Sequence, residues 1–319
     1  MSSLSPRADT CESGNTYNGE YLGARISAVF VLLGVSAIGS FFPLVAKQCP
    51  WIKLPPWVFF GTKYVGTGVI VATGFVHLLA EAHEALTNPC LGPPFDYPWT
   101  EGIALMGVFL IFFMDLIAHR KLEQKEAEWA ERQECIEMAQ ASEKEFPIIK
   151  TTEENTYQQI LNTLFLEFGI VFHSVFVGLS LAIAGDQFKS LYVAIAFHQL
   201  LEGLGLGTRF ATTPWPEKKW YVPWCLSLAY TLTTPIAIAI GIGVRKSYPP
   251  NSRRALITTG VFDALCGGVL IYNSLVELMA YDFFFSPDFK GKNGMANTIK
   301  AYILLSIGAG IMAVIGKWA

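Results

Sequence analysis

The hydrophobic positions of this chain fall into long, nearly uninterrupted runs separated by polar stretches. A helix rises about 1.5 Å per residue, so about 20 apolar residues cross the hydrocarbon core of a membrane. Such runs favour helices over a strand barrel, whose segments are short and alternate between apolar and polar residues. We expect eight membrane-spanning helices, at residues 23–46, 58–86, 101–119, 157–184, 190–210, 222–244, 254–280 and 299–318.

The composition agrees with this pattern. The chain has 319 residues, of which 52% are hydrophobic and 15% are charged, whereas soluble domains average about 25% charged residues. The predicted fold class is therefore an all-α polytopic membrane protein with eight helices in one bundle, and the lipid bilayer is its first partner. The net charge is −3, with no broad basic patch, so we expect no nucleic-acid partner.

The polar stretches divide the chain and orient it. We distinguish an N-terminal segment (1–22), spans one to three (23–119), a charged loop (120–156), spans four and five (157–210) and spans six to eight (211–319). Lys and Arg are more frequent in the loops on one side, and this side is expected to be cytosolic. Both termini should then lie outside, with the charged loop in the cytosol.

The six cysteines form no CxxC pair. In this orientation Cys11 and Cys90 both face outside, where a disulfide is allowed. Six free thiols remain the alternative, and the sequence does not decide between them.

The histidines indicate the chemistry. All five fall in or at the ends of the predicted spans: His77, His83, His119, His173 and His198. The link between spans four and five is short, so these spans should run antiparallel. Counted from this link at about 1.5 Å per residue, His173, His198 and Glu202 all lie about 20 Å from one membrane surface. Two imidazoles and a carboxylate should therefore meet near the middle of the bilayer.

A metal ion would explain polar groups at this depth. A single histidine in a span is commonly a hydrogen-bonded packing residue, and a carboxylate there costs about 3 kcal/mol. A divalent cation would offset this cost, and imidazole nitrogen with carboxylate oxygen is an ordinary ligand set for zinc. The set also suits Fe²⁺ or Mn²⁺. Gln199 and Ser174 could add weaker oxygen ligands.

Other polar residues in the spans suggest an ion path. In span two, His77, Glu81 and Glu84 share one helix face in the outer half. They form either an entrance for cations or a helix end that emerges into water. Glu167 lies about 9 Å from His173 toward the cytosol.

Glu167, Glu277 and His119 could line an exit. A carboxylate near the inner interface explains Glu167 equally well, and anchoring at the membrane interface explains Glu277 and His119 better. Asp263 receives no role. Gly178 and the glycines of EGLGLG predict that spans four and five press together, because small residues let membrane helices approach closely.

These motifs resemble a known family. HSVFVGLSLA in span four, FHQLLEGLGLG in span five, GTGVIVATGFVHLLAEA in span two and TLTTPIAIAIGIG in span six are similar to the ZIP family of zinc and iron transporters, most closely its fungal zinc-uptake branch. The resemblance implies eight helices with both ends outside and places the metal site at His173, Ser174, His198, Gln199 and Glu202.

The resemblance also implies an activity and its setting. It implies import of Zn²⁺, with Fe²⁺, Mn²⁺ or Cd²⁺ as other candidate ions, from outside or from a lumen into the cytosol, without a prosthetic group. Many members act as homodimers, and an elevator-like motion of one helix bundle has been proposed for the family. The fungal likeness favours the plasma membrane.

The sequence departs from the family at several positions. Some members carry Glu four residues after the histidine of span four, where this chain has Val177, and span six has no acidic residue. We therefore expect one main ion instead of two. The charged loop has no histidine, which disfavours metal sensing there.

Two other function classes use similar residues. An intramembrane zinc-dependent hydrolase could hold its metal with the same histidines and carboxylate. However, the chain contains neither HExxH nor GxSxG. A metal-sensing receptor would need a binding domain, and the outside segments are short. A transporter that is not an enzyme is the better reading.

Overall fold

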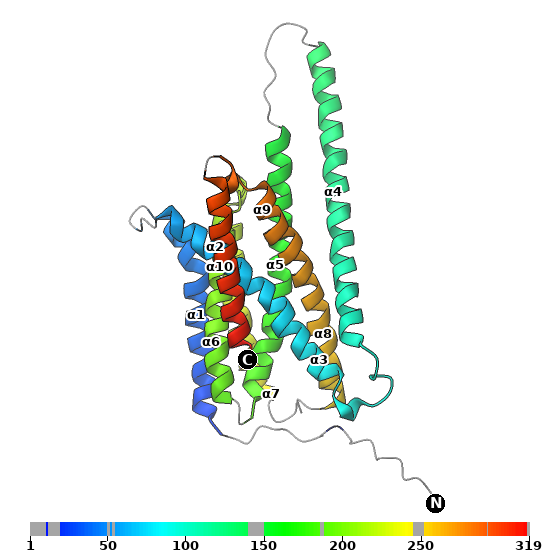
Figure 1. Ribbon diagram of the computed structural model, residues 1–319, viewed down its shortest axis with the longest axis vertical. Helices are drawn as coiled ribbons and strands as arrows, with labels where there is room; N and C mark the ends of the chain where they lie inside the picture. The colour runs from blue at the N-terminus through cyan, green and yellow to red at the C-terminus, as the bar shows by residue number, and fades with distance from the viewer. Residues whose placement is uncertain are drawn as a thin grey trace, which may run out of the picture.

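The computed structural model describes residues 11, 20–49, 52, 55–139, 150–185, 188–244, 252–291 and 293–317. All regular elements within these ranges are helical, and most run lengthwise through one bundle, which the helical run at residues 56–86 crosses obliquely (Figure 1). The first helix begins and the last helix ends at the same end of this bundle. In the predicted orientation this is the outer end.

The helices follow the predicted spans closely. The long ones are α1 (Leu22–Gln48), α2 (Pro56–Ala72), α4 (Trp99–Ala139), α5 (Lys150–Ile183), α6 (Phe188–Thr212), α7 (Val222–Val244), α8 (Arg253–Tyr272) and α10 (Gly294–Ile315). Two of the predicted spans are composite. The second continues from α2 through a π-helical segment, η1 (Thr73–Leu78), into α3 (Leu79–Leu86), and the seventh from α8 through the π-helical η4 (Asn273–Ala280) into α9 (Tyr281–Phe285).

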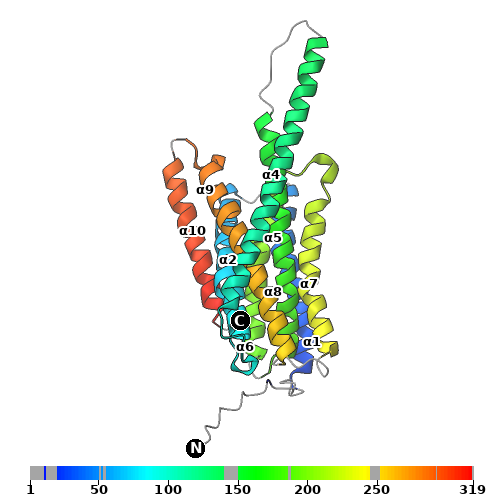
Figure 2. The same ribbon diagram turned by 90° about the vertical axis from the view of Figure 1, so that its right-hand side faces the viewer.

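The described parts of the connections contain the single 3₁₀ turns η2 (Pro89–Leu91), η3 (Glu217–Lys219) and η5 (Pro287–Phe289). The third helix extends well past its predicted end at residue 119, because α4 continues for 41 residues to Ala139 (Figure 2). The first part of the predicted charged loop is thus helical, and residues 140–149 lie outside the described part.

Within the described residues, seven helical segments are long and apolar enough to cross a membrane. α6 is not among them, although it has 25 residues. It carries His198, Gln199 and Glu202, and these polar side chains lower its apolar content. The predicted count of eight spans therefore depends on the helix that also carries most of the predicted metal site.

The helices pack in two groups. The first helix group consists of α1, α5, α6 and α7, where α1 packs against α6 and α7, and α5 packs against α7. The second helix group contains α2, α3, α4, α8, α9 and α10, where α2 packs against α10, and both α3 and α4 pack against α8. The groups meet where α6 packs against α2 and where α5 packs against α8.

The glycines of α6 make contacts other than those predicted. A Cβ atom on Gly205 would lie 2.8 Å from Gly66 Cα of α2, and one on Gly207 would overlap Ser40 O of α1. On α5, Gly178 faces Thr234 of α7 in the same way. α5 and α6 contact each other far less than they contact these partners. The prediction that they press together was wrong, and their glycines instead fix each helix against another neighbour.

A disulfide joins two of the cysteines. Cys11 is bonded to Cys90, which lies between α3 and α4. This settles the choice that the sequence left open. Cys49, Cys225 and Cys266 are free.

Ion pairs join the two groups near the inner end. Arg209 Nη2 of α6 lies 2.8 Å from Asp282 Oδ2 of α9, and Lys63 Nζ of α2 lies 3.2 Å from Asp282 Oδ1. Beside them, Thr208 Oγ1 of α6 donates a hydrogen bond to Thr62 Oγ1 of α2 at 3.1 Å. A cavity of about 720 Å³ opens here, and Lys63, Arg209 and Asp282 are among its lining residues.

Candidate metal centre

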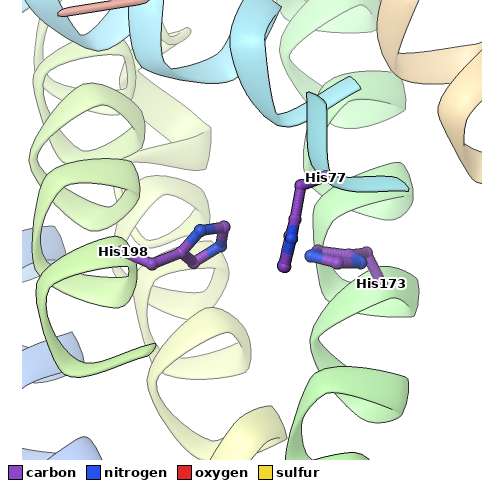
Figure 3. Close-up of side chains that lie close together, drawn as sticks. All are labelled: His77, His173 and His198. Atoms are coloured by element: carbon purple, nitrogen blue, oxygen red, sulfur yellow. The ribbon is translucent and has the colours of Figure 1, made fainter. Parts of the chain in front are cut away.

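Three histidines from three separate helical segments converge in the interior of the bundle (Figure 3). His77 comes from η1, His173 from α5 and His198 from α6. Each offers one nitrogen, and these nitrogens all lie within 4.8 Å of one another. The ring centroids are 5.0 Å apart for His77 and His198, 5.3 Å for His77 and His173, and 5.9 Å for His173 and His198. This spacing suits three imidazoles around one ion.

The site spans both helix groups. His173 and His198 belong to the first group, whereas His77 belongs to the second. The π-helical segment that presents His77 packs against α8, where a Cβ atom on Gly74 would lie 3.0 Å from Ile271 Cγ1. The extra residue of a π turn changes the direction in which the following side chains leave the helix, and such turns occur frequently at functional sites.

The nitrogens of these rings lack partners. The three side chains are at most 4% exposed. Neither ring nitrogen of His173 or His198 has a hydrogen-bond partner, and the same holds for Nε2 of His77. Unpartnered polar atoms in an apolar interior are unfavourable. A bound metal ion would satisfy one nitrogen of each ring.

Glu81 orients the ring of His77. Its Oε1 lies 3.2 Å from His77 Nδ1, one helical turn away. With Nδ1 engaged by the carboxylate, Nε2 is the nitrogen left for an ion. A carboxylate behind a ligating histidine is a common arrangement, which fixes the ring and raises its basicity.

One buried carboxylate contacts a histidine of the group, and a second lies near the first. Glu202 Oε2 is 3.5 Å from His198 Nε2, and Glu202 is 0% exposed. Glu167 is also buried, and none of the four carboxylate oxygens has a hydrogen-bond partner. The two carboxylates are near enough to repel each other electrostatically. Two neighbouring buried acids, one of them in contact with His198, make this part of the interior attractive to a cation.

The amide and hydroxyl of the predicted ligand set are buried here too. Gln199 and Ser174 are each 1% exposed, and Gln199 Nε2 has no hydrogen-bond partner. The backbone carbonyl of Gln199 accepts a 2.6 Å hydrogen bond from Tyr230 OH of α7. This bond holds the metal-site turn of α6 against α7.

The structure brings together the residues that the sequence predicts at one depth in the membrane, and it adds His77 to them. His173 and His198 meet, and Glu202 contacts His198, but Glu202 is not part of the mutually close group. His77, expected at the entrance, lies in the group itself. The same residue count would have found it, because His77 lies nine residues from the outer end of α3, and His173 and His198 each lie ten residues from the outer ends of α5 and α6.

The predicted exit residues differ in their surroundings. Glu277 is 8% exposed and lies in η4, which packs against both α2 and α5. His119 instead lies on α4, which packs mainly against α8. Its side chain is 46% exposed, and Nε2 is 3.4 Å from Glu123 Oε1. Val177, which stands where some members of the resembled family carry Glu, is buried in an apolar cluster with Ile238 and Leu181.

Comparison with known proteins connects this geometry to an activity. Residues 22–316 match the family model described as ZIP zinc transporter. The chain is 39% identical to zinc-regulated transporter 2 of Saccharomyces cerevisiae, across 98% of this chain and 97% of that protein. It is 38% identical to zinc-regulated transporter 1 of the same yeast, across 96% and 90%. It is 31% identical to Fe(2+) transport protein 1 of Arabidopsis thaliana, across 99% and 92%.

Proposed function

Because this chain belongs to the ZIP zinc transporter family, we propose that it imports Zn²⁺ through the three-histidine group in its interior. Membership makes the protein a transporter of divalent metal and not an enzyme. The hydrolase alternative receives no support from the relatives. Zn²⁺ is the transported substrate here, not a resident cofactor.

The observation that carries the proposal is the convergence of His77, His173 and His198. Their nitrogens lie within 4.8 Å of one another, at most 4% exposed, in a membrane protein of this family. We assign them as the principal ligands, with Glu202 as the acid that compensates the charge of the ion. Gln199 and Ser174 are the weaker oxygen donors.

The proposed path runs through the boundary of the two helix groups. Glu81, 37% exposed, and His77 receive the cation from the outer end. On the inner side, Glu167 and Glu277 accept it from the histidines. We leave His119 out of this path because its half-exposed side chain contacts Glu123 on a peripheral helix.

Several finer expectations belong to the same proposal. The His and Glu ligands suit Zn²⁺ and would also accept Fe²⁺, Mn²⁺ or Cd²⁺. The names of the relatives, two zinc-regulated transporters and one Fe(2+) transport protein, support the first two ions. We propose the plasma membrane as the location, both termini outside, and a homodimer as the assembly.

Uptake of radioactive zinc into proteoliposomes tests the proposal. The purified chain should carry ⁶⁵Zn²⁺, and His173→Ala and His198→Ala should each reduce uptake to the level of empty vesicles. His83→Ala is the matched control, because this histidine is 57% exposed at the outer end, where its Nδ1 lies 3.4 Å from Glu101 Oε1. Uptake near the wild-type rate in both test variants would reject the site.

A further inference from the structure

A buried acid outside the proposed site lacks a partner. Asp263 of α8 is 0% exposed, and neither of its carboxylate oxygens has a hydrogen-bond partner. Asp263 belongs neither to the three-histidine group nor to the ion path through Glu81, His77, Glu167 and Glu277. An ionised carboxylate in the hydrocarbon region is strongly unfavourable, and such residues commonly mark functional sites.

The packing of α8 against α3 places Asp263 beside Glu81. A Cβ atom on Gly260 would contact Leu86 and Ala85, and one on Gly267 would contact Leu79 and Leu78. The two helices are therefore antiparallel, and Asp263 faces the part of α3 between these contacts. Glu81 lies in this part, and the two carboxylates are near enough to repel each other.

The surrounding groups leave this acid pair without a fixed cation. Glu81 contacts His77 Nδ1 on one side, and Glu84 adds a further negative charge nearby. His83 contacts Glu101 instead. Cys266 is close to Asp263 but packs with Leu78 and Leu270 in an apolar cluster. Within the described part of the chain, no Lys or Arg forms an ion pair with either acid, so a bound cation would relieve the repulsion between them.

The side chains of Glu81 and Asp263 differ in their exposed fractions. Glu81 is 37% exposed, whereas Asp263 and His77 are 0% and 4% exposed. Glu81 thus touches the outer surroundings with one part of its side chain and the metal centre, through His77, with another. The contacts of Gly260 with Leu86 and of Gly267 with Leu79 place Asp263 at nearly the same depth as Glu81, and Asp263 is the fully buried member of the pair.

We propose that Glu81 and Asp263 form a second divalent-cation site, which receives the ion at the outer side before it binds the three histidines. This inference rests on the proposed function and adds a step to it. Two carboxylates leave most of the coordination shell to water, so the ion arrives still largely hydrated. Oxygen ligands also accept Mn²⁺, Mg²⁺ and Ca²⁺, so this site discriminates less than the imidazoles behind it.

Ion counting with the central site removed tests the inference directly. Full-length protein carrying both His173→Ala and His198→Ala would be dialysed against Zn²⁺ alone or Mn²⁺ alone, and bound metal would be measured by mass spectrometry. One ion should remain. Adding Asp263→Asn or Glu81→Gln should remove it, whereas adding Glu101→Gln, which neutralises an exposed acid at the same end, should leave it.

Transport of the single variant gives an independent readout. Asp263→Asn should raise the Zn²⁺ concentration for half-maximal uptake by at least about tenfold, while the maximal rate stays near that of the wild type. The metal-free variant should unfold at a temperature no lower than the wild type, because a buried charge has been removed. If Asp263→Asn does not fold, Glu81→Gln tests the same proposed cation site.

Three results would overturn the inference. One is no residual ion in the double histidine variant, and another is a residual ion that neither acid variant removes. The third is an unchanged half-maximal concentration with an altered pH profile, which indicates a shared proton in place of a metal. These results concern the second site alone. The proposed three-histidine site would instead be rejected by normal uptake in His173→Ala and His198→Ala.

Discussion

At the scale of single residues, the buried acids of the site are unfavourable until an ion arrives. Glu202 is 0% exposed and has no hydrogen-bond partner for either oxygen. A charge at such depth costs about 3 kcal/mol on insertion scales. The same charge attracts the cation. Removing it should therefore raise the stability of the metal-free protein and lower its affinity for metal.

Glu202→Gln separates these two effects. Without metal, in the presence of a chelator, the variant should unfold at a higher temperature than the wild type, because the uncompensated charge is gone. With Zn²⁺ added, it should gain less stability than the wild type. Thermal unfolding in detergent, followed by tryptophan fluorescence with and without Zn²⁺, measures both. A variant that loses stability without metal and gains normally with it would contradict this role.

His77→Ala tests the ligand that the depth argument missed. If its Nε2 is a ligand, uptake at low Zn²⁺ should fall nearly as far as in His173→Ala. Glu81→Gln, which leaves the ring in place but removes its orienting acid, should weaken affinity by about 10- to 100-fold. Uptake of ⁶⁵Zn²⁺ measured over a range of concentrations distinguishes the two variants. Small and equal effects of both would mean that His77 lines the entrance and is not a ligand.

Residue spacing predicted part of this site and missed the rest for a physical reason. Counting along two antiparallel helices brought His173 and His198 to one depth, because helical rise is constant. His77 lies at the same depth but was read only by its own helix face. Depth alone also could not show that Glu202 contacts His198 without joining the mutually close nitrogens, since that depends on side-chain direction.

At the scale of elements, glycines decide which helices can touch. Gly205 of α6 and Gly66 of α2 meet backbone to backbone, where a side chain has no space. The sequence showed that one face of α6 carries small residues, but small residues do not specify which neighbouring helix packs against that face. The π-helical segments η1 and η4, which present His77 and Glu277, gave no recognisable signal in the sequence.

Gly205→Val should therefore disrupt the contact between the two helix groups. Its Cβ atom would lie 2.8 Å from Gly66 Cα, and the backbone cannot move as a flexible side chain would. We expect a loss of about 1–3 kcal/mol and a smaller monodisperse fraction in size-exclusion chromatography. Gly34→Val on α1, where a Cβ atom meets nothing within 4 Å, is the control and should behave as wild type. Equal behaviour of both variants would contradict the packing.

At the scale of the whole molecule, two helix groups share one site. His77 lies in the second group and the other two histidines lie in the first, so a bound ion links them in the interior. Near the inner end, Asp282 links them again through Arg209, while Lys63 holds Asp282 within the second group. The family and the helical fold were predicted from sequence and are confirmed, whereas this division into groups depends on contacts between distant segments.

The shared acceptor predicts an asymmetry between two variants. Asp282→Ala leaves both Arg209 and Lys63 without their common carboxylate in a site that is largely buried. Arg209→Ala leaves Asp282 with Lys63. We expect the first variant to lower the unfolding temperature clearly more than the second, as measured in detergent at one salt concentration. The reverse order would show that this cluster does not hold the groups together.

The most direct test of the central claim is X-ray absorption spectroscopy of the full-length protein loaded with one equivalent of Zn²⁺. Three imidazoles around the ion predict histidine nitrogen scatterers at about 2.0–2.1 Å and no sulfur. In His77→Ala the imidazole signal should decrease by one ring. A first shell with sulfur at about 2.3 Å, or one made of oxygen with no imidazole, would contradict the account.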